Sequence, residues 1–366
     1  MLNETGAQEE GVIDRVTFFP NETKALVYSG PHLWVANPIY KTPRRICIEK
    51  ADYDVVDLNY IDAYYLQRTN YKITDYSNLI RKMPTTPWNT YYNEEYRVAF
   101  RRRLNLKQER TLIGAIIPRG TFHTNLVNSI CFRDIRKTAL FAGLIASLPY
   151  DFLIKTLGKG DLYDEGIRKL PFISSKYDND IILRALLLNC LSLNYLEIWK
   201  KCFTKDFTNN KWAKDDIRLS NDKFLSLNEK LDLCDIPKSD YERYQLLVEL
   251  DVLVSMGLEI SLDQLSNLYR IQFPVMQIYE VDTWYDRNGR IVFTNNRGLS
   301  GVGLSRPEWE QIKDAKEGVF YQTIEDDTIP GGPVTRTIEY VAPFDRCDRE
   351  KDYEEVWHNF EKRFGK

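Results

Sequence analysis

The chain has 366 residues, of which 43% are hydrophobic and 28% are charged, values typical of a folded protein with a large core. Its formal net charge of -3 excludes a uniformly basic nucleic-acid-binding surface, although a local basic patch is compatible with it. Six scattered cysteines without a CxxC pair, and three histidines far apart in the sequence, argue against a zinc ribbon, a redox motif or a histidine-rich metal site.

The sequence also argues against membrane insertion. The opening stretch "MLNETGAQEEG" is polar and acidic, unlike a signal peptide. The most apolar stretch, residues 138–154, is shorter than the roughly 20 residues that a membrane span needs, and Pro149 and Asp151 interrupt it. We therefore expect a cytoplasmic protein with no membrane partner and with free thiols.

The first half of the chain predicts mixed structure. Residues 1–95 contain short apolar runs, turns and prolines, which favour short strands and loops. Residues 94–110 have a helical pattern, and 111–118 predict a buried strand that ends at Pro118. Residues 135–157 predict a buried helix with a break near Pro149.

The second half begins with helices and ends with hairpins. Residues 179–204 are rich in leucine and predict a central helix, and capping boxes at Ser239 and Ser261 predict two more. Beyond these helices, Asn288-Gly289 predicts a hairpin turn with positive φ at both central residues. A helix from Ser305, a second hairpin and a helix from about Asp348 follow. The predicted class is α+β, in three regions: a mixed α/β region (1–175), a helical region (176–270) and a hairpin-helix unit (271–366).

Residues 37–40 read Asn-Pro-Ile-Tyr, close to a methyltransferase motif. Enzymes that methylate an exocyclic amino group carry Asn-Pro-Pro-Tyr or a close variant, which stacks on a flipped base and accepts its amino protons. Here Ile39 replaces the second proline, and only 36 residues precede Asn37, too few for the domain that holds S-adenosylmethionine. No glycine-rich cofactor turn follows a strand in the next hundred residues. We predict no catalytic residue and no cofactor site in this chain.

A glycine loop at 298–303 follows the strand "RIVFT" and precedes a capped helix. Arg297 and Arg306 flank it, so backbone amides and two cations would suit a phosphate. Its spacing, Gly-x-x-Gly-x-Gly, is neither a Walker loop nor a dinucleotide motif. The loop is either a tight strand-to-helix connection or an anion contact, with nucleotide catalysis the weakest reading.

Basic residues concentrate between Arg97 and Arg119, interleaved with aromatic residues, a combination that suits phosphates and stacked bases. The alternative is a solvated helix face. The cations of this stretch are Arg97, Arg101, Arg102, Arg103, Lys107, Arg110 and Arg119. A second basic set, flanking "TLGKGD", comprises Lys155, Lys159, Arg168 and Lys169.

Residues 139–173, "ALFAGLIASLPYDFLIKTLGKGDLYDEGIRKLPFI", resemble the end of target-recognition domains in type IIG restriction-methyltransferases and type I specificity subunits. Other stretches, among them "RTLIGAIIPRG" and "VAPFDRCDREKDYEEVWHNFEKRF", resemble the C-terminal part of large adenine-specific DNA methyltransferases of restriction and phage-defence systems. The resemblance implies a specificity half, with target-recognition structure in region 1–175. It also implies two partners, double-stranded DNA and a catalytic methyltransferase that supplies S-adenosylmethionine.

For such a module we expect two kinds of DNA contact. The predicted phosphate contacts are Arg101, Arg102, Arg103, Arg119, Lys155 and Lys159. The predicted base-edge contacts are Asn295, Asn296 and Arg297, with Arg306 nearby as a further DNA contact.

Two other functions remain open at this stage. A metal-dependent nuclease subunit would use Asp14, Glu22 and Lys24, since nucleases need clustered carboxylates and a lysine. The second carboxylate-lysine string, residues 314–316, is expected inside a capped helix. A structural adaptor of a defence complex would use the basic patch to bind acidic protein.

Overall fold

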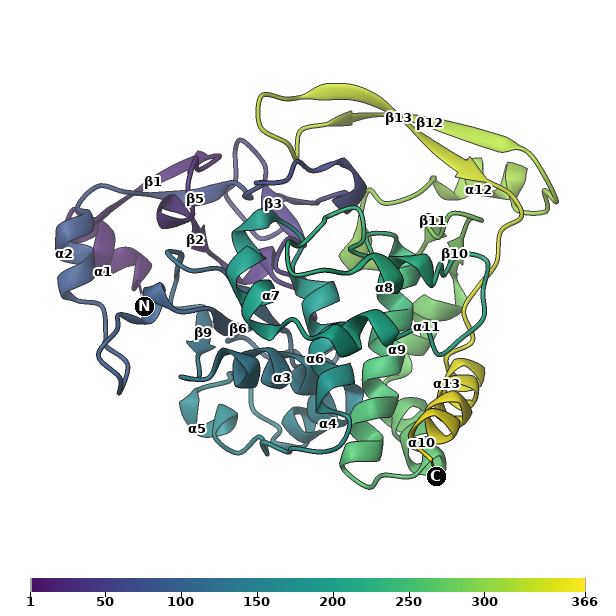
Figure 1. The fold of residues 1–366 in the computed structure, drawn as a ribbon. Helices are drawn as coiled ribbons and strands as arrows, with labels where there is room; N and C mark the ends of the chain where they lie inside the picture. Colours follow the sequence, from purple (N-terminus) through teal and green to yellow (C-terminus); the bar gives the residue numbers. More distant parts are fainter. Residues whose placement is uncertain (1, 366) are drawn as a thin grey trace.

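The computed structural model describes residues 2–365 and confirms an α+β fold (Figure 1). In Figure 1 most helices lie in the centre and at the lower right, the strands of the N-terminal part lie at the left, and the two C-terminal hairpins lie at the upper right. The largest hydrophobic cluster includes residues from Val35 to Phe360, so all three predicted regions contribute to it. The domain boundaries themselves stay a prediction.

The helical centre is built around four helices that are buried on most sides. These are α3 (Ile135–Ala146), α4 (Leu148–Thr156), α6 (Asp178–Asn189) and α9 (Asp240–Gly257). A Cβ atom added at Gly143 of α3 would lie 2.5 Å from the Ile181 side chain of α6, so glycine permits their close approach. The helices packed around this centre are α5 (Asp164–Ile167), α7 (Leu196–Cys202), α8 (Asp222–Ser226), α10 (Leu262–Gln272), α11 (Pro274–Val281) and α13 (Arg349–Phe364).

The N-terminal part consists of short strands and loops, as predicted, with two short helices, α1 (Glu4–Glu9) and α2 (Tyr76–Arg81). Its largest sheet has the order β7-β6-β9 and is antiparallel. The strands of that sheet are β6 (Arg97–Arg101), β7 (Gly114–Ile117) and β9 (Val127–Ile130). The paired strands outside it are β1 (Ile13–Phe18) with β5 (Thr69–Ile73), β2 (Val27–Tyr28) with β8 (Phe122–His123), and β3 (Lys41–Pro43) with β4 (Tyr53–Val55).

The C-terminal part contains the two predicted hairpins. The first joins β10 (Thr283–Tyr285) to β11 (Ile291–Thr294), and α12 (Arg306–Ile312) follows it. The second joins β12 (Val319–Asp326) to β13 (Val334–Val341) and lies across the top of the molecule in Figure 1. This long hairpin contacts the N-terminal part, because Tyr65 donates to the carbonyl oxygen of Thr328 at 2.6 Å.

The helix starts were predicted well. Ser239, Ser261 and Ser305 cap α9, α10 and α12 through capping boxes, and Asp348 caps α13. The buried helix at 135–157 is present and breaks at Ser147, two residues before Pro149.

Four local predictions are wrong. Residues 94–110 are not helical: Val98, Ala99 and Phe100 are all buried because β6 is the central strand of its sheet. The helix predicted for 179–204 ends at Asn189, whose side chain turns to accept from the backbone N–H of Ile116 at 2.8 Å, and α7 begins afresh at Leu196.

The third and fourth corrections concern turns. At Asn288-Gly289 only the glycine has positive φ, of 81°, because the Asp286 carboxylate accepts from the N–H groups of Asn288 and Arg290 and shapes the turn. Residues 314–316 lie in the turn after α12, which ends at Ile312.

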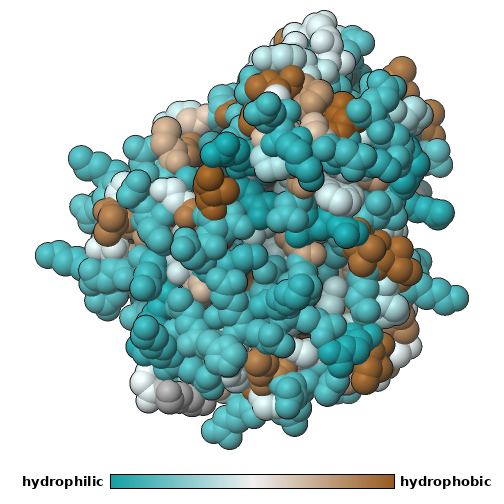
Figure 2. Space-filling view, turned by 90° about the vertical axis from the view of Figure 1, so that its right-hand side faces the viewer, coloured by the Kyte–Doolittle hydropathy of each residue, from teal (hydrophilic) through white to brown (hydrophobic). Residues whose placement is uncertain are grey.

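No single helix within residues 2–365 is long and apolar enough to cross a membrane; α3 and α4 pass that test of length and composition only together, and they bend by 72° at their junction. Figure 2 views the molecule from the right-hand side of Figure 1 and shows a mainly hydrophilic face, on which hydrophobic side chains form small, separate groups.

Candidate functional site

A cleft of about 640 Å³ lies where segments from all three predicted regions meet. One wall is formed by residues near Trp34 and Asp57, another by α9 and α11, and a third by the glycine loop and the inner face of the β12–β13 hairpin. This volume is in the range of about 300–1,000 Å³ that small-molecule sites usually have.

Most charges that line the cleft neutralise one another. Burial would raise the pKa of Asp57, but the guanidinium groups of Arg290 and Arg336, each 3.0 Å away, outweigh it and hold that pKa below its usual value. Arg336 also pairs with Asp326 at 2.7 Å, and Arg349 with Glu280 at 2.7 Å. These pairs fix the walls and leave little free charge.

Five charged groups that line the same cleft lack an ion-pair partner within residues 2–365: Glu109, Lys238, Asp240, Arg243 and Glu325. Arg243 donates weakly to the carbonyl oxygen of Ala36 at 3.3 Å, its Nη1 has no partner there, and burial lowers its pKa to about 10. Burial raises the pKa of Glu109, which accepts from the Asn296 amide at 2.9 Å. Burial also raises the pKa of Asp240 to about 6, although this carboxylate accepts from the backbone N–H of Ile291.

Two stacked aromatic rings form one edge of the cleft, and one cation lies over each ring. The Trp34 and Tyr40 ring centroids are 5.1 Å apart. Arg101 lies over the Trp34 ring and Lys41 over the Tyr40 ring, each at 5.2 Å. Partial burial and then the charge of Arg101 lower the pKa of both Lys41 and Lys50. We call Trp34, Tyr40, Lys41, Lys50 and Arg101 the basic-aromatic rim.

The Asn-Pro-Ile-Tyr stretch belongs to this part of the cleft. Asn37 and Tyr40 line it, whereas Ile39 is buried in the core. Asn37 uses its side-chain oxygen to accept from the N–H of Ile39 at 3.0 Å, and Tyr40 donates to the carbonyl oxygen of Gly298. That the stretch is not a catalytic loop stays a prediction.

The predicted phosphate contacts on β6 and beyond have partners inside the protein. The guanidinium group of Arg101 donates to the carbonyl oxygens of Gly30, at 2.8 Å, and of Leu33. Arg102 and Arg103 both lie near Asp161, at 3.7 and 3.5 Å.

The other three predicted phosphate contacts are dispersed over the surface. Arg119 is paired with Glu197 and, at 3.7 Å, with Glu95. Lys155 donates to the carbonyl oxygen of Gln272 at 2.6 Å, and Lys159 lies 3.9 Å from Glu165. Most of these partners are distant in the sequence, and the partner of Lys155 is a backbone carbonyl oxygen, so the sequence could not predict the contacts.

The predicted base-edge contacts differ from one another. Asn295 and Arg297 are exposed, and neither makes a side-chain hydrogen bond or ion pair within the described chain. The side chain of Asn296 is already hydrogen-bonded: it accepts from the Gly298 N–H at 2.8 Å and donates to Glu109. Arg306 pairs with Asp282 at 2.7 Å and lies over the Phe293 ring.

The glycine loop makes a tight connection and also forms part of the cleft wall. Gly303 has φ of 76°, and a Cβ atom there would lie 2.5 Å from the carbonyl oxygen of Val292, so only glycine fits. Gly301, with φ of 85°, has open space around it and lines the cleft. Whether the loop contacts an anion stays open.

The residues suggested for a nuclease lie away from this cleft. Asp14 is on β1, opposite Lys72, whereas Glu22 and Lys24 lie in and beside a single 3-10 turn. Among residues 2–365 no group of three or more His, Cys, Asp and Glu side chains could hold a metal ion. The six cysteines are free thiols.

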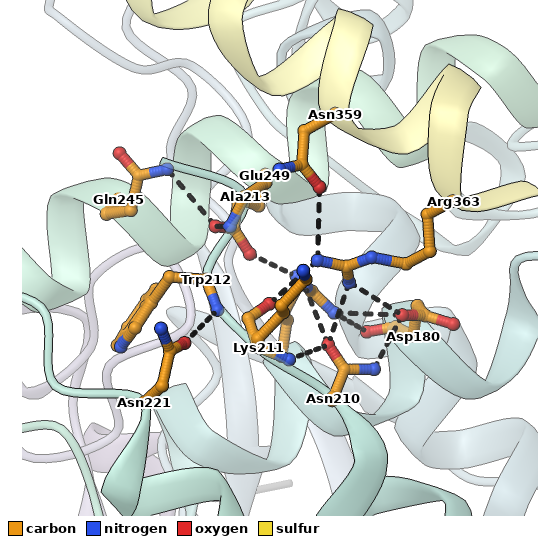
Figure 3. Close-up of polar contacts among 11 residues, drawn as sticks. Asp180, Asn210, Lys211, Trp212, Ala213, Asn221, Gln245, Glu249, Asn359 and Arg363 are labelled. Atoms are coloured by element: carbon orange, nitrogen blue, oxygen red, sulfur yellow. Dashed lines mark hydrogen bonds and ion pairs between the residues drawn. The ribbon is translucent and has the colours of Figure 1, made fainter. Parts of the chain in front are cut away.

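A second polar cluster, deep in the helical centre, is linked by hydrogen bonds and ion pairs (Figure 3). Arg184 and Glu249 are fully buried and pair at 2.6 Å. The same carboxylate accepts from the Ala213 N–H at 2.7 Å, and Asn210 bridges Arg184 to Arg363. The cluster therefore ties α6, α9 and α13 to the loop before α8.

No protein-family model matches this chain, and neither a curated protein nor a solved structure is significantly similar to it.

Proposed function

We propose that the chain is the DNA-binding target-recognition module of a site-specific adenine DNA methyltransferase in a restriction or phage-defence system. The catalytic half, with its S-adenosylmethionine, would belong to a partner subunit or domain. Such a module would work in the cytoplasm, where its DNA is. The proposal starts from the sequence resemblance and is supported by the basic-aromatic rim.

The rim carries the proposal because none of its cations has a carboxylate oxygen within 4 Å in the described chain. Lys41 and Lys50 lie close enough to Arg101 for its charge to lower their pKa, and like charges gathered in this way favour a bound anion. Phosphates of DNA supply such an anion, and the adjoining Trp34–Tyr40 pair offers aromatic surface.

The pairing pattern revises which cations we expect to contact phosphate. Arg102, Arg103 and Arg119 face carboxylates, so DNA would have to compete with those partners. Lys41 and Lys50 face no such competition at ion-pair distance, and we place them first among the phosphate contacts.

Base reading is proposed for Arg297 and Asn295, which stand free at the start of the glycine loop. A guanidinium group can donate two hydrogen bonds to guanine, and an amide can bond adenine in the same way. The acidic tail offers no alternative partner to Arg297, since Asp345 lies near Arg218 and Asp348 pairs with Lys351.

The test is to express the chain with its methyltransferase partner, replace Arg297 with Ala and sequence the methylated sites. We expect a relaxed preference at one position of the target, since one such contact discriminates by about 1–3 kcal/mol. Bulk DNA affinity should be largely kept. An identical methylated motif would place the reading surface elsewhere, and no binding of duplex DNA at low salt by the wild-type chain would refute the proposed function.

A further inference from the structure

The cleft holds polar groups that the proposed reading of duplex DNA does not use. Arg243, Glu109 and Asn37 all line it, and each retains unused bonding capacity. Nη1 of Arg243, Oε1 of Glu109 and the side-chain NH₂ of Asn37 make no hydrogen bond within residues 2–365.

Short contacts connect these groups to the aromatic pair. Arg243 reaches the carbonyl oxygen of Ala36, the residue before Asn37. Tyr40 donates to Gly298, whose N–H in turn donates to Asn296, and Asn296 donates to Glu109. A cation, an amide, a carboxyl group and two aromatic rings therefore share one part of the cleft.

The cation lacks a counter-charge. Of the two nearest carboxylates, Glu242 is held by Lys223 and caps α9, and Asp240 accepts from the Ile291 N–H without coming within 4 Å of Arg243. A partly buried cation without an ion-pair partner is poorly solvated, so an anion that enters the cleft would gain from binding to it. Asp240 opposes that anion when ionised, and its raised pKa weakens this opposition below about pH 6.

The remaining groups suit a nucleobase. Stacked aromatic rings offer an apolar surface to a planar ring. A carboxyl oxygen accepts a hydrogen bond from an exocyclic amino group, and the amide NH₂ of Asn37 can donate to a ring nitrogen or carbonyl oxygen beside it. Thymine has no amino group and could offer Glu109 only its ring N3–H.

We infer that the cleft binds a single nucleotide whose base carries an exocyclic amino group. The base lies against the Trp34–Tyr40 side with its edge at Glu109 and Asn37, and its phosphate lies toward Arg243. The nucleotide is either free or an unpaired unit of a DNA strand. Only binding of an unpaired unit of a DNA strand rests on the proposed function.

The probes are dAMP, dGMP, dCMP and TMP, and single-stranded tetranucleotides, titrated calorimetrically against the full chain. We expect saturable binding of the three amino-bearing monophosphates or of strands that contain them, with thymine weakest. Arg243→Gln should weaken binding about 10- to 100-fold, because it removes a charge-assisted hydrogen bond. Glu109→Gln should reduce the preference over thymine.

Two further variants keep the test clear of folding defects. Ser300→Trp fills the cleft from an exposed position whose side chain makes no hydrogen bond in the described chain, and should abolish binding. Arg287→Gln is the matched control, an exposed arginine outside the cleft lining, and should bind as the wild type does.

Binding to strands but not to free monophosphates assigns the site to an unpaired nucleotide of DNA, and binding to both assigns it to free nucleotide as well. No saturable binding at millimolar concentration, or equal loss in Arg287→Gln and Arg243→Gln, overturns the inference. Duplex affinity and the methylated motif are measured separately through Arg297, so failure here is distinguishable from failure of the proposed function.

Discussion

Arginines that are wholly or partly buried occur in both the helical centre and the cleft, but they are neutralised differently. In the helical centre, Arg184 meets Glu249 at 2.6 Å and Asp180 at 3.4 Å. At the cleft, Arg243 and the rim residue Arg101 lose water as well, yet within the described chain they donate to backbone carbonyl oxygens. A carboxylate cancels the charge, whereas a carbonyl group leaves it in place. The first arrangement holds elements together, and the second keeps positive charge facing the cleft.

The largest expected effect comes from breaking the helical cluster. Replacing Glu249 with Ala leaves Arg184 buried beside only the more distant Asp180, at 3.4 Å. Loss of one member of a buried pair costs about 3–5 kcal/mol of unfolding free energy. Urea unfolding should show this loss, while Glu165→Ala, in an exposed pair with Lys169, should leave the midpoint unchanged. Similar midpoints for both variants would contradict a role for the cluster in stability.

The second prediction concerns Asp240, a carboxyl group of the cleft that has no cation at ion-pair distance. Its folded pKa of about 6 lies above the usual 3.8, because burial outweighs the nearby Arg290 and Arg243 while Asp57 adds to the rise. The native chain therefore binds this proton more tightly than the unfolded chain does. The contribution favours folding at low pH and is lost as pH rises from about 4 to 6.

Replacing Asp240 with Asn should remove this pH dependence. The variant should match the wild type near pH 4 and exceed its stability at pH 7 by about 1–3 kcal/mol. Urea midpoints measured at pH values one unit apart would show the difference between the variant and the wild type growing as the pH rises. A constant difference across the range would mean that Asp240 does not titrate in the native cleft.

A third experiment compares unpaired with paired cations directly. Replacing Lys41 and Lys50 with Gln should weaken duplex DNA binding for all sequences and reduce the slope of log affinity against log salt by about 1.8, or about 0.9 per phosphate contact. Arg119→Gln is the matched control, because Glu197 and Glu95 already neutralise that arginine. Equal slopes for the two variants would show that pairing does not decide which cations meet DNA.

The smallest expected effect is at an exposed pair. Arg44 pairs with Asp54 at 2.9 Å on the outer part of the cleft wall, where water and salt screen the charges. Arg44→Gln should change the unfolding free energy by no more than about 0.5 kcal/mol. Chemical denaturation in low and high salt would test this, and a loss of several kcal/mol would show that exposed pairs here behave like buried ones.

Local signals predicted the elements whose causes are local. The side chains of Ser239, Ser261 and Asp348 accept from backbone N–H groups three residues away, and Ser305 donates to the Glu308 carboxylate three residues away. The starts of four helices could therefore be located from neighbouring residues in the sequence. The helix predicted for residues 97–101 is wrong for the opposite reason. Their pattern resembles that of a basic helix, but they form a strand because they are buried between β7 and β9. The candidate site followed the same division, since the exposed Asn295 and Arg297 were proposed from the sequence and the rim residues Lys41 and Lys50 were not.

The sequence by itself determined the α+β class, the helix caps, the two C-terminal hairpins and the presence of a basic, aromatic-rich stretch. Only the tertiary structure decided which charges are neutralised. Arg119 lies 78 residues from its partner Glu197, and Arg184 lies 65 residues from Glu249. Charge neutralisation depends on distance in space, because the attraction between two charges weakens as they separate. The sequence gives only the order of residues along the chain.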